Sequence, residues 1–272
     1  MPLDQLEKGV NIKGLVLPET SKTESFDIFE EITPKDMQNL RSAFDSQLQN
    51  ESRNFIATGS TLKIFDPDIS FSDDEKAIKR VAEPFLASRL EDGLWFDGGV
   101  LLMNLKQMGM SDLVNKYKTD QVARGLIGEL GQKSELTWAF SRLLTACKVL
   151  GVLDQYPLIN PDEVKSALLI KAEDSKRNED IIGFFSRVAA ARIVFPDVAG
   201  NMTGIDWNGI KSTINNYRRD SISDEAFTQY LTYTAIATAD KVAVTDRGIE
   251  LTRRPREFQA PPSPHLPQRR RF

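Results

Sequence analysis

The sequence has few of the side chains on which metal sites and nucleophilic active sites depend. Its 272 residues include a single cysteine, Cys147, and a single histidine, His265. A disulfide needs two cysteines, and zinc sites and Ser-His or Cys-His catalytic pairs need more of these residues, or a histidine inside a folded core. We therefore expect no disulfide, no metal site, no bound cofactor and no enzyme activity of these kinds.

Long apolar runs are also missing. No uninterrupted apolar stretch approaches the roughly 18 residues of a transmembrane helix, and the mean hydropathy is -0.34. The first residues lack the basic start and apolar stretch of a signal peptide. Apolar residues still make up 40% of the chain, enough to bury a sizeable core. We expect a soluble protein without a membrane span.

The charged residues are graded along the chain. Residues 1–100 carry a net charge of -8, residues 101–240 a net charge of -1, and residues 241–272 a net charge of +5, for -4 overall. Such a gradient is typical of a protein that assembles head to tail or carries a basic nucleic-acid arm. Solvated tails also acquire a charge bias, so both interpretations stay open.

Helical signals dominate the pattern along the chain. Residues 33–36, Thr-Pro-Lys-Asp, have the hydroxyl, proline and carboxylate of a helix N-terminus, and residues 72–75 form a second predicted capping box. At 54–65, Gly59 and Ser60 separate two runs rich in β-branched and aromatic residues, which predicts a hairpin. From residue 72 the apolar stripes recur at helical spacing for about 170 residues.

These patterns predict an all-α protein of two helical lobes with one minor β-hairpin. We expect an extended N-terminal arm over residues 1–32 and an N-terminal helical lobe over residues 33–151. A C-terminal helical lobe is expected over residues 152–245, followed by a basic, proline-rich tail over residues 246–272. The tail is too polar and too rich in proline to pack a core alone.

Two patterns favour other functions only weakly. Residues 125–134 resemble a phosphate-binding loop, but their spacing is wrong and no strand precedes them. Paired carboxylates such as Glu91 and Asp92 are expected by chance in a chain with 39 acidic residues. An enzyme that uses carboxylates is therefore the third of three hypotheses, and we expect a non-catalytic protein.

Basic residues recur between the apolar stripes, several of them near helix ends where backbone amides can also meet phosphates. If the two lobes face each other, these cations line one groove. The alternative is that they coat the solvent-facing sides of helices, because acidic residues are nearly as numerous in the same region. The predicted RNA-binding residues are Lys106, Lys118, Arg124, Lys133, Arg142, Lys148, Arg187, Arg192, Arg218 and Arg219.

The predicted N-terminal arm alternates apolar clusters with polar spacers. It is too apolar for a solvated tail and too interrupted for an independent helix, so it gains stability only by docking on a groove. That groove belongs either to a neighbouring subunit, which produces a homo-oligomer, or to its own lobe. The predicted oligomerisation residues are Val10, Ile12, Leu15, Leu17, Phe26 and Phe29.

Three segments are similar to a known family. The first is residues 95–109, which begin Trp-Phe-Asp-Gly-Gly and end Lys-Gln-Met-Gly. The others are residues 186–191 and residues 195–202. They resemble segments of the nucleocapsid proteins of phlebovirus-like and tenuivirus-like segmented negative-strand RNA viruses. The resemblance implies an all-α, two-lobed protein that sequesters single-stranded RNA in a basic cleft. It also implies polymerisation through an N-terminal arm docked on the neighbour.

The leading hypothesis is thus a non-catalytic viral nucleocapsid protein that binds the RNA phosphate backbone and assembles into rings or filaments, giving a ribonucleoprotein. Its expected location is the virion and the host cytoplasm. The alternative is a helical, cytoplasmic scaffold or effector whose proline-rich tail binds a protein partner.

Overall fold

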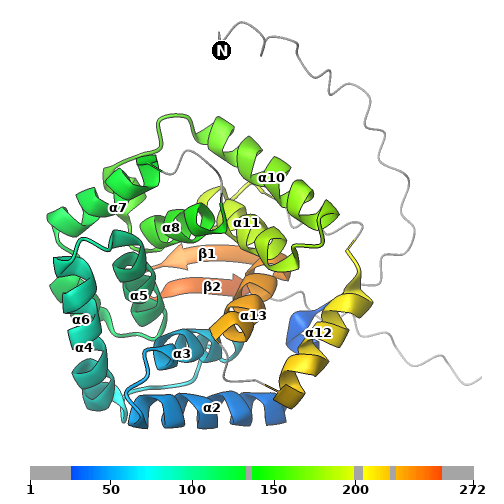
Figure 1. The fold of residues 1–272 in the computed structure, drawn as a ribbon, viewed down its shortest axis with the longest axis horizontal. Helices are drawn as coiled ribbons and strands as arrows, with labels where there is room; N and C mark the ends of the chain where they lie inside the picture. The colour runs from blue at the N-terminus through cyan, green and yellow to red at the C-terminus, as the bar shows by residue number, and fades with distance from the viewer. Residues whose placement is uncertain (1–25, 133–136, 199–204, 221–224, 253–272) are drawn as a thin grey trace, which may run out of the picture.

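The computed structural model describes residues 26–132, 137–198, 205–220 and 225–252 (Figure 1). Within these ranges it contains thirteen helices and one two-stranded sheet, which confirms the predicted all-α class with a minor hairpin. None of the helices in these ranges combines the length and the apolar character needed to span a bilayer. The elements are α1 Ile28–Glu31, α2 Pro34–Gln49, α3 Asn54–Phe65, α4 Glu75–Glu91, α5 Trp95–Gln107, α6 Ser111–Tyr117, α7 Asp120–Gln132, α8 Trp138–Val149, α9 Val152–Gln155, α10 Pro161–Arg177, α11 Ile181–Val194, α12 Trp207–Asp220, α13 Glu225–Thr238, β1 Lys241–Thr245 and β2 Gly248–Thr252.

Five inner helices form a closed ring. Helix α3 contacts α5, α5 contacts α8, α8 contacts α11, α11 contacts α13, and α13 returns to α3. These helices are buried on most of their sides, as expected of helices that are apolar nearly all round. Outer helices cover them: α2 packs on α3, α4 and α7 pack on α5, and α10 packs on α11 (Figure 1).

The buried residues form one continuous apolar cluster. It includes residues of both predicted lobes, because α8 of the first lobe packs directly on α11 of the second. Phe185 on α11 lies near the middle of this core, fully buried, and its ring meets those of Phe184 and Tyr230 edge to face at 5.2 and 6.0 Å. Such aromatic pairs add to the free energy gained by apolar burial.

The hairpin predicted at 54–65 is wrong, because these residues form helix α3. Gly59 is buried inside the helix, where a Cβ would lie only 2.7 Å from the Met108 methyl group. The hydroxyl groups of Thr58 and Thr61 donate to backbone carbonyls one turn earlier, as they do in helices. The β-branched and aromatic residues therefore reflect burial on all sides of a helix, which overrides their preference for strands.

The sheet lies instead at 241–252. Strands β1 and β2 pair antiparallel with Thr245 opposite Gly248, so Asp246 and Arg247 form a two-residue loop. Gly248 has a φ of +117°, which only glycine adopts readily. The hairpin packs on α3, α5, α8 and α11. The predicted start of the tail at residue 246 therefore falls inside a folded hairpin, and the undescribed C-terminal segment begins at 253.

The last part of the predicted arm packs on its own chain. The Phe26 ring stacks on Trp207 of α12 with centroids 4.5 Å apart, and the Phe29 ring lies 5.1 Å from that of Phe65. Residues 28–31 form α1, which contacts α13. Phe26 and Phe29 thus pack on their own chain, but Phe26 and α1 contact the predicted C-terminal lobe and only Phe29 contacts α3 of the N-terminal lobe. Val10, Ile12, Leu15 and Leu17 lie outside the described residues.

An ion pair joins the start of α2 to α12. The guanidinium of Arg218 donates to both carboxylate oxygens of Asp36 at 2.8 to 3.1 Å, and also to the carbonyl of Glu31. Asp36 accepts two further hydrogen bonds from the backbone N–H and the hydroxyl of Thr33, which confirms the capping box predicted there. Burial alone raises the pKa of Asp36, but these hydrogen bonds outweigh it and hold the pKa below its ordinary value.

The Asp36–Arg218 ion pair is expected to make the free energy of unfolding depend on pH. Because the folded-state pKa of Asp36 is lowered, its contribution is present above the unfolded-state pKa of about 3.9 and is lost as the pH falls through the folded-state value. The Arg218→Met variant should therefore be less stable than the wild type by about 1 to 3 kcal/mol at neutral pH. This difference should shrink as the pH falls below the unfolded-state pKa and through the lower folded-state pKa of Asp36. Urea unfolding of both proteins across this pH range measures it, and an equal difference at every pH would show that the charge of Asp36 is not involved.

Candidate nucleic-acid interface

A tight reversal of the chain ends α8 and starts α9. Helix α8 ends at Val149, and Gly151 adopts the left-handed conformation with a φ of +71°. A residue with a side chain is strained there, so the glycine allows the chain to turn at once into α9. At this turn the backbone N–H groups of Leu150 and Gly151 donate to the carbonyls of Ala146 and Lys148, and helix C-termini also attract cations.

Three predicted RNA-binding lysines meet at this turn. The ammonium group of Lys106, at the end of α5, donates to the Val149 carbonyl at 2.8 Å. The Lys118 ammonium lies 3.7 Å from the position a Cβ on Gly151 would take. Lys148, on α8 itself, pairs with Asp154 on α9 at 3.1 Å. We call Lys106, Lys118 and Lys148 the lysine cluster.

The pKa of Lys106 reflects its place in the lysine cluster. Partial burial lowers the pKa of Lys106, and the charge of Lys118 lowers it further. Asp154 and Asp246 act in the opposite direction but do not outweigh these two effects. Three cations therefore face two carboxylates, and the positive charge of the cluster is only partly neutralised.

Arg124 extends the basic surface from α7. Its side chain is hydrogen bonded to Tyr156, which raises the pKa of Arg124. Tyr156 directly follows α9, the helix that also carries Asp154, so Arg124 and Lys148 both contact the short segment 154–156. Tyr156 is half-buried and was not among the predicted contacts.

Three predicted RNA-binding arginines are buried in the fold. Arg142 lies against the rings of Phe96 and Trp138, with its guanidinium carbon 5.7 and 5.4 Å from the centroids. Arg187 donates to the Ser175 hydroxyl at 2.7 Å and lies 3.6 Å from the Asp180 carboxylate. Arg142 thus packs on side chains of α5 and α8, and Arg187 lies between α11 and the outer helix α10, so neither of these contacts involves the lysine cluster.

Arg192 is buried as well, and its guanidinium donates to three backbone carbonyls, those of Ile236, Ala237 and Asp240, at 2.8 to 3.1 Å. It thereby binds the end of α13 and the start of the hairpin. Arg218 forms its ion pair with Asp36 between α12 and α2. Lys133 lies outside the described residues, and the side chain of Arg219 is not described.

The structure thus brings together Lys106, Lys118, Lys148 and, beside them, Arg124, out of the ten predicted contacts. This surface offers cations but no activated nucleophile. The one cysteine, Cys147, is fully buried on α8, and burial raises its pKa to about 12, so the thiol stays protonated at neutral pH. The cations of this surface can bind an anion.

The chain matches no protein-family model, and no curated protein or solved structure matches it either.

Proposed function

We propose that this chain is a non-catalytic nucleocapsid protein that binds single-stranded RNA through its phosphate backbone. The observation that carries the proposal is the convergence of the lysine cluster, with Arg124 beside it, on one short segment of the surface. Ammonium groups act on phosphates as point charges without reading bases. Binding of this kind suits a protein that must cover RNA of any sequence.

The proposal also fits the character of the cations. Lys106 has a structural role because it caps the last turn of α8, and that role alone would account for one cation at this place. Burial lowers the pKa of Lys106, and the charge of Lys118 lowers it further by a repulsion that Asp154 and Asp246 only partly offset. A bound phosphate would relieve this repulsion. Assembly of several copies along one RNA strand is the second part of the proposal and rests on the apolar clusters of residues 1–25.

Charge reversal at the lysine cluster is expected to weaken RNA binding. The triple variant Lys118→Glu, Arg124→Glu, Lys148→Glu should lower the affinity for an unstructured RNA by at least about tenfold near 50 mM salt, because cations that release counterions from phosphates are removed. The dependence of log affinity on log salt should become shallower by roughly 0.7 for each phosphate that no longer meets a cation. Fluorescence anisotropy across salt concentrations measures both, and light scattering of the complexes measures assembly.

The control changes the net charge equally at three exposed cations elsewhere on α4 and α10: Lys76→Glu, Arg80→Glu, Lys171→Glu. The control should keep its affinity within about twofold, because surface charges farther away than the Debye length, about 14 Å near 50 mM salt, are largely screened. Equal losses in both triple variants would show that net charge, not the lysine cluster, governs binding. Wild-type protein that fails to bind RNA at low salt would refute the proposed function.

A further inference from the structure

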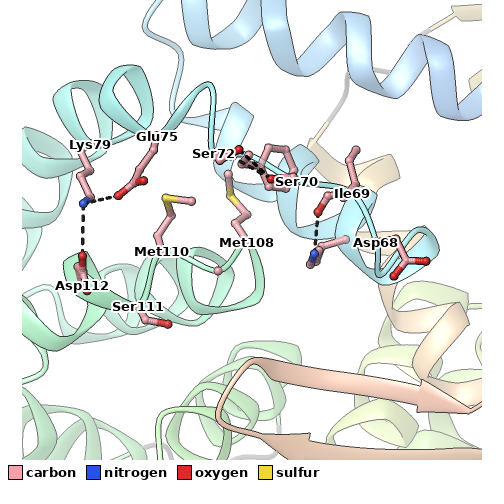
Figure 2. A pocket seen from close by; sticks show the side chains of 13 residues that line it. Asp68, Ile69, Ser70, Ser72, Glu75, Lys79, Met108, Met110, Ser111 and Asp112 are labelled. Atoms are coloured by element: carbon pink, nitrogen blue, oxygen red, sulfur yellow. Dashed lines mark hydrogen bonds and ion pairs between the residues drawn. The ribbon is translucent and has the colours of Figure 1, made fainter.

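A hollow opens between the loop at 66–74, the start of α4 and the turn from α5 to α6 (Figure 2). Its volume is about 470 Å³, within the range of sites that bind ligands. Phe71, Met108 and Met110 line it with apolar side chains that are almost fully buried. Figure 2 shows the two methionines facing the space between the loop and α6.

The rim of the hollow is polar, and its two lysines are engaged. Lys63 donates to the Ile69 carbonyl at 2.6 Å, and Lys79 pairs with Glu75 at 2.5 Å and more loosely with Asp112 at 3.7 Å. The side chain of Asp112 is 87% exposed. Among the described residues, no side chain binds the carboxylate of Asp68. Asp68 and Asp112 thus place a carboxylate at each end of the hollow, and Asp112 stays largely exposed although it pairs loosely with Lys79 (Figure 2).

A hollow with exposed carboxylates at a mainly polar rim and a small apolar floor suits arginine next to an aromatic or aliphatic residue. A guanidinium pairs with a carboxylate through two parallel hydrogen bonds while its stem covers apolar surface. Methionine sulfur makes favourable contacts with aromatic rings. Residues 253–272 of this chain combine both elements: they contain six arginines and one glutamate, and residues 268–272 read Gln-Arg-Arg-Arg-Phe.

The described part of the chain also ends within reach of the hollow. Strand β2 contacts α3 and α5, and Gln107, the neighbour of Met108, holds Ile249 through two hydrogen bonds of 2.6 and 3.0 Å. The 16 residues from Thr252 to Gln268 span up to about 50 Å when extended. A tether of this length keeps the arginines near the hollow at an effective concentration on the order of millimolar.

From these observations we infer that the hollow lined by Met108, Met110 and Asp68 is a docking site for the arginine-rich segment 268–272 of the same chain. The arginines pair with Asp68 and Asp112 at the rim, and an apolar side chain of the segment covers the small exposed part of Met108 and Met110. This docking site is independent of the proposed RNA surface, because the lysine cluster contributes nothing to the hollow.

Disulfide trapping in the full-length chain tests the inference. One cysteine is introduced at the rim by Ser111→Cys and one in the segment by Gln268→Cys, while Cys147 is buried and leaves the reaction unaffected. The reference pair combines Gln268→Cys with Lys171→Cys, an exposed position on α10 across the molecule (Figure 1). The Ser111 pair should form an intrachain disulfide at least about tenfold faster than the reference pair, because docking raises the local concentration.

Neutralising the rim separates docking from chance encounter. Adding Asp68→Asn and Asp112→Asn to the Ser111 pair should reduce its rate to that of the reference pair, whereas Asp162→Asn and Asp174→Asn on α10 should leave it unchanged. Equal rates for the Ser111 and Lys171 pairs would overturn the inference, and so would a Ser111 rate that ignores the rim charges. A covalent dimer as the main product would overturn the assignment to the same chain.

Discussion

The Arg192→Met variant is expected to be about 3 to 5 kcal/mol less stable than the wild type. Methionine replaces most of the apolar stem of arginine but donates no hydrogen bonds. The carbonyls of Ile236, Ala237 and Asp240 then lose their guanidinium partner in a buried place, and each unsatisfied acceptor costs about 1 to 3 kcal/mol. The junction of α13 and the hairpin should loosen first.

Urea unfolding followed by circular dichroism measures this loss, with Lys171→Met on exposed α10 as the matched control. The control should change the free energy of unfolding by no more than about 0.5 kcal/mol, as surface substitutions usually do. RNA affinity measured on the folded fraction of Arg192→Met should equal that of the wild type. A variant with unchanged stability and reduced RNA affinity would instead assign Arg192 to the RNA, as the sequence pattern predicted.

Local signals in the sequence located some elements and misplaced others. The predicted capping box at Thr33 is confirmed because its two hydrogen bonds join residues only three positions apart. The one predicted at residues 72–75 is wrong: α4 begins at Glu75, and its N-cap, Asp74, makes no capping hydrogen bond because its carboxylate binds Arg41. A competing long-range partner is not visible in a window of four residues.

The hairpin was also misplaced because a long-range contact decides the structure of residues 54–65. At 54–65 the pattern of β-branched residues around Gly59 is that of a strand pair, but the close approach of Gly59 to Met108 requires a helix packed on α5. The true hairpin also had a signal, the alternation of residues 241–245 followed by Asp-Arg-Gly. That signal lay across the predicted boundary between the second lobe and the tail.

The candidate site was predictable by residue type but not by position. Lys106, Lys118 and Lys148 come from three different segments, and only the fold brings them to Gly151. Arg187 and Arg192 lie in a run of apolar and small residues from 181 to 195, a context that favours burial of their stems over exposure. Charge alone does not distinguish an arginine that holds backbone carbonyls from one that binds phosphate.

Truncation of Phe185 to alanine is expected to cost about 3 to 5 kcal/mol of stability, through the missing transfer free energy and the cavity left behind. Phe185 is fully buried and meets the rings of Phe184 and Tyr230, so the truncation also removes both aromatic pairs. Phe185→Leu fills more of the space and should cost clearly less, about 1.5 kcal/mol. Ile170→Ala, at a side chain that is 62% exposed, is the matched control and should change little.

The shape of the unfolding curve of Phe185→Ala also tests how the two predicted lobes are coupled. The buried apolar cluster is continuous from α8 of the first predicted lobe to α11 of the second. Phe185 lies on α11, the helix that packs on α8. Weaker packing there should therefore destabilise residues 33–151 together with residues 152–245, and a single cooperative transition should shift to lower urea. Two separate transitions, one of them unchanged from the wild type, would instead show lobes that fold independently. A shift far below 3 kcal/mol would mean that the core around α11 relaxes to fill the cavity.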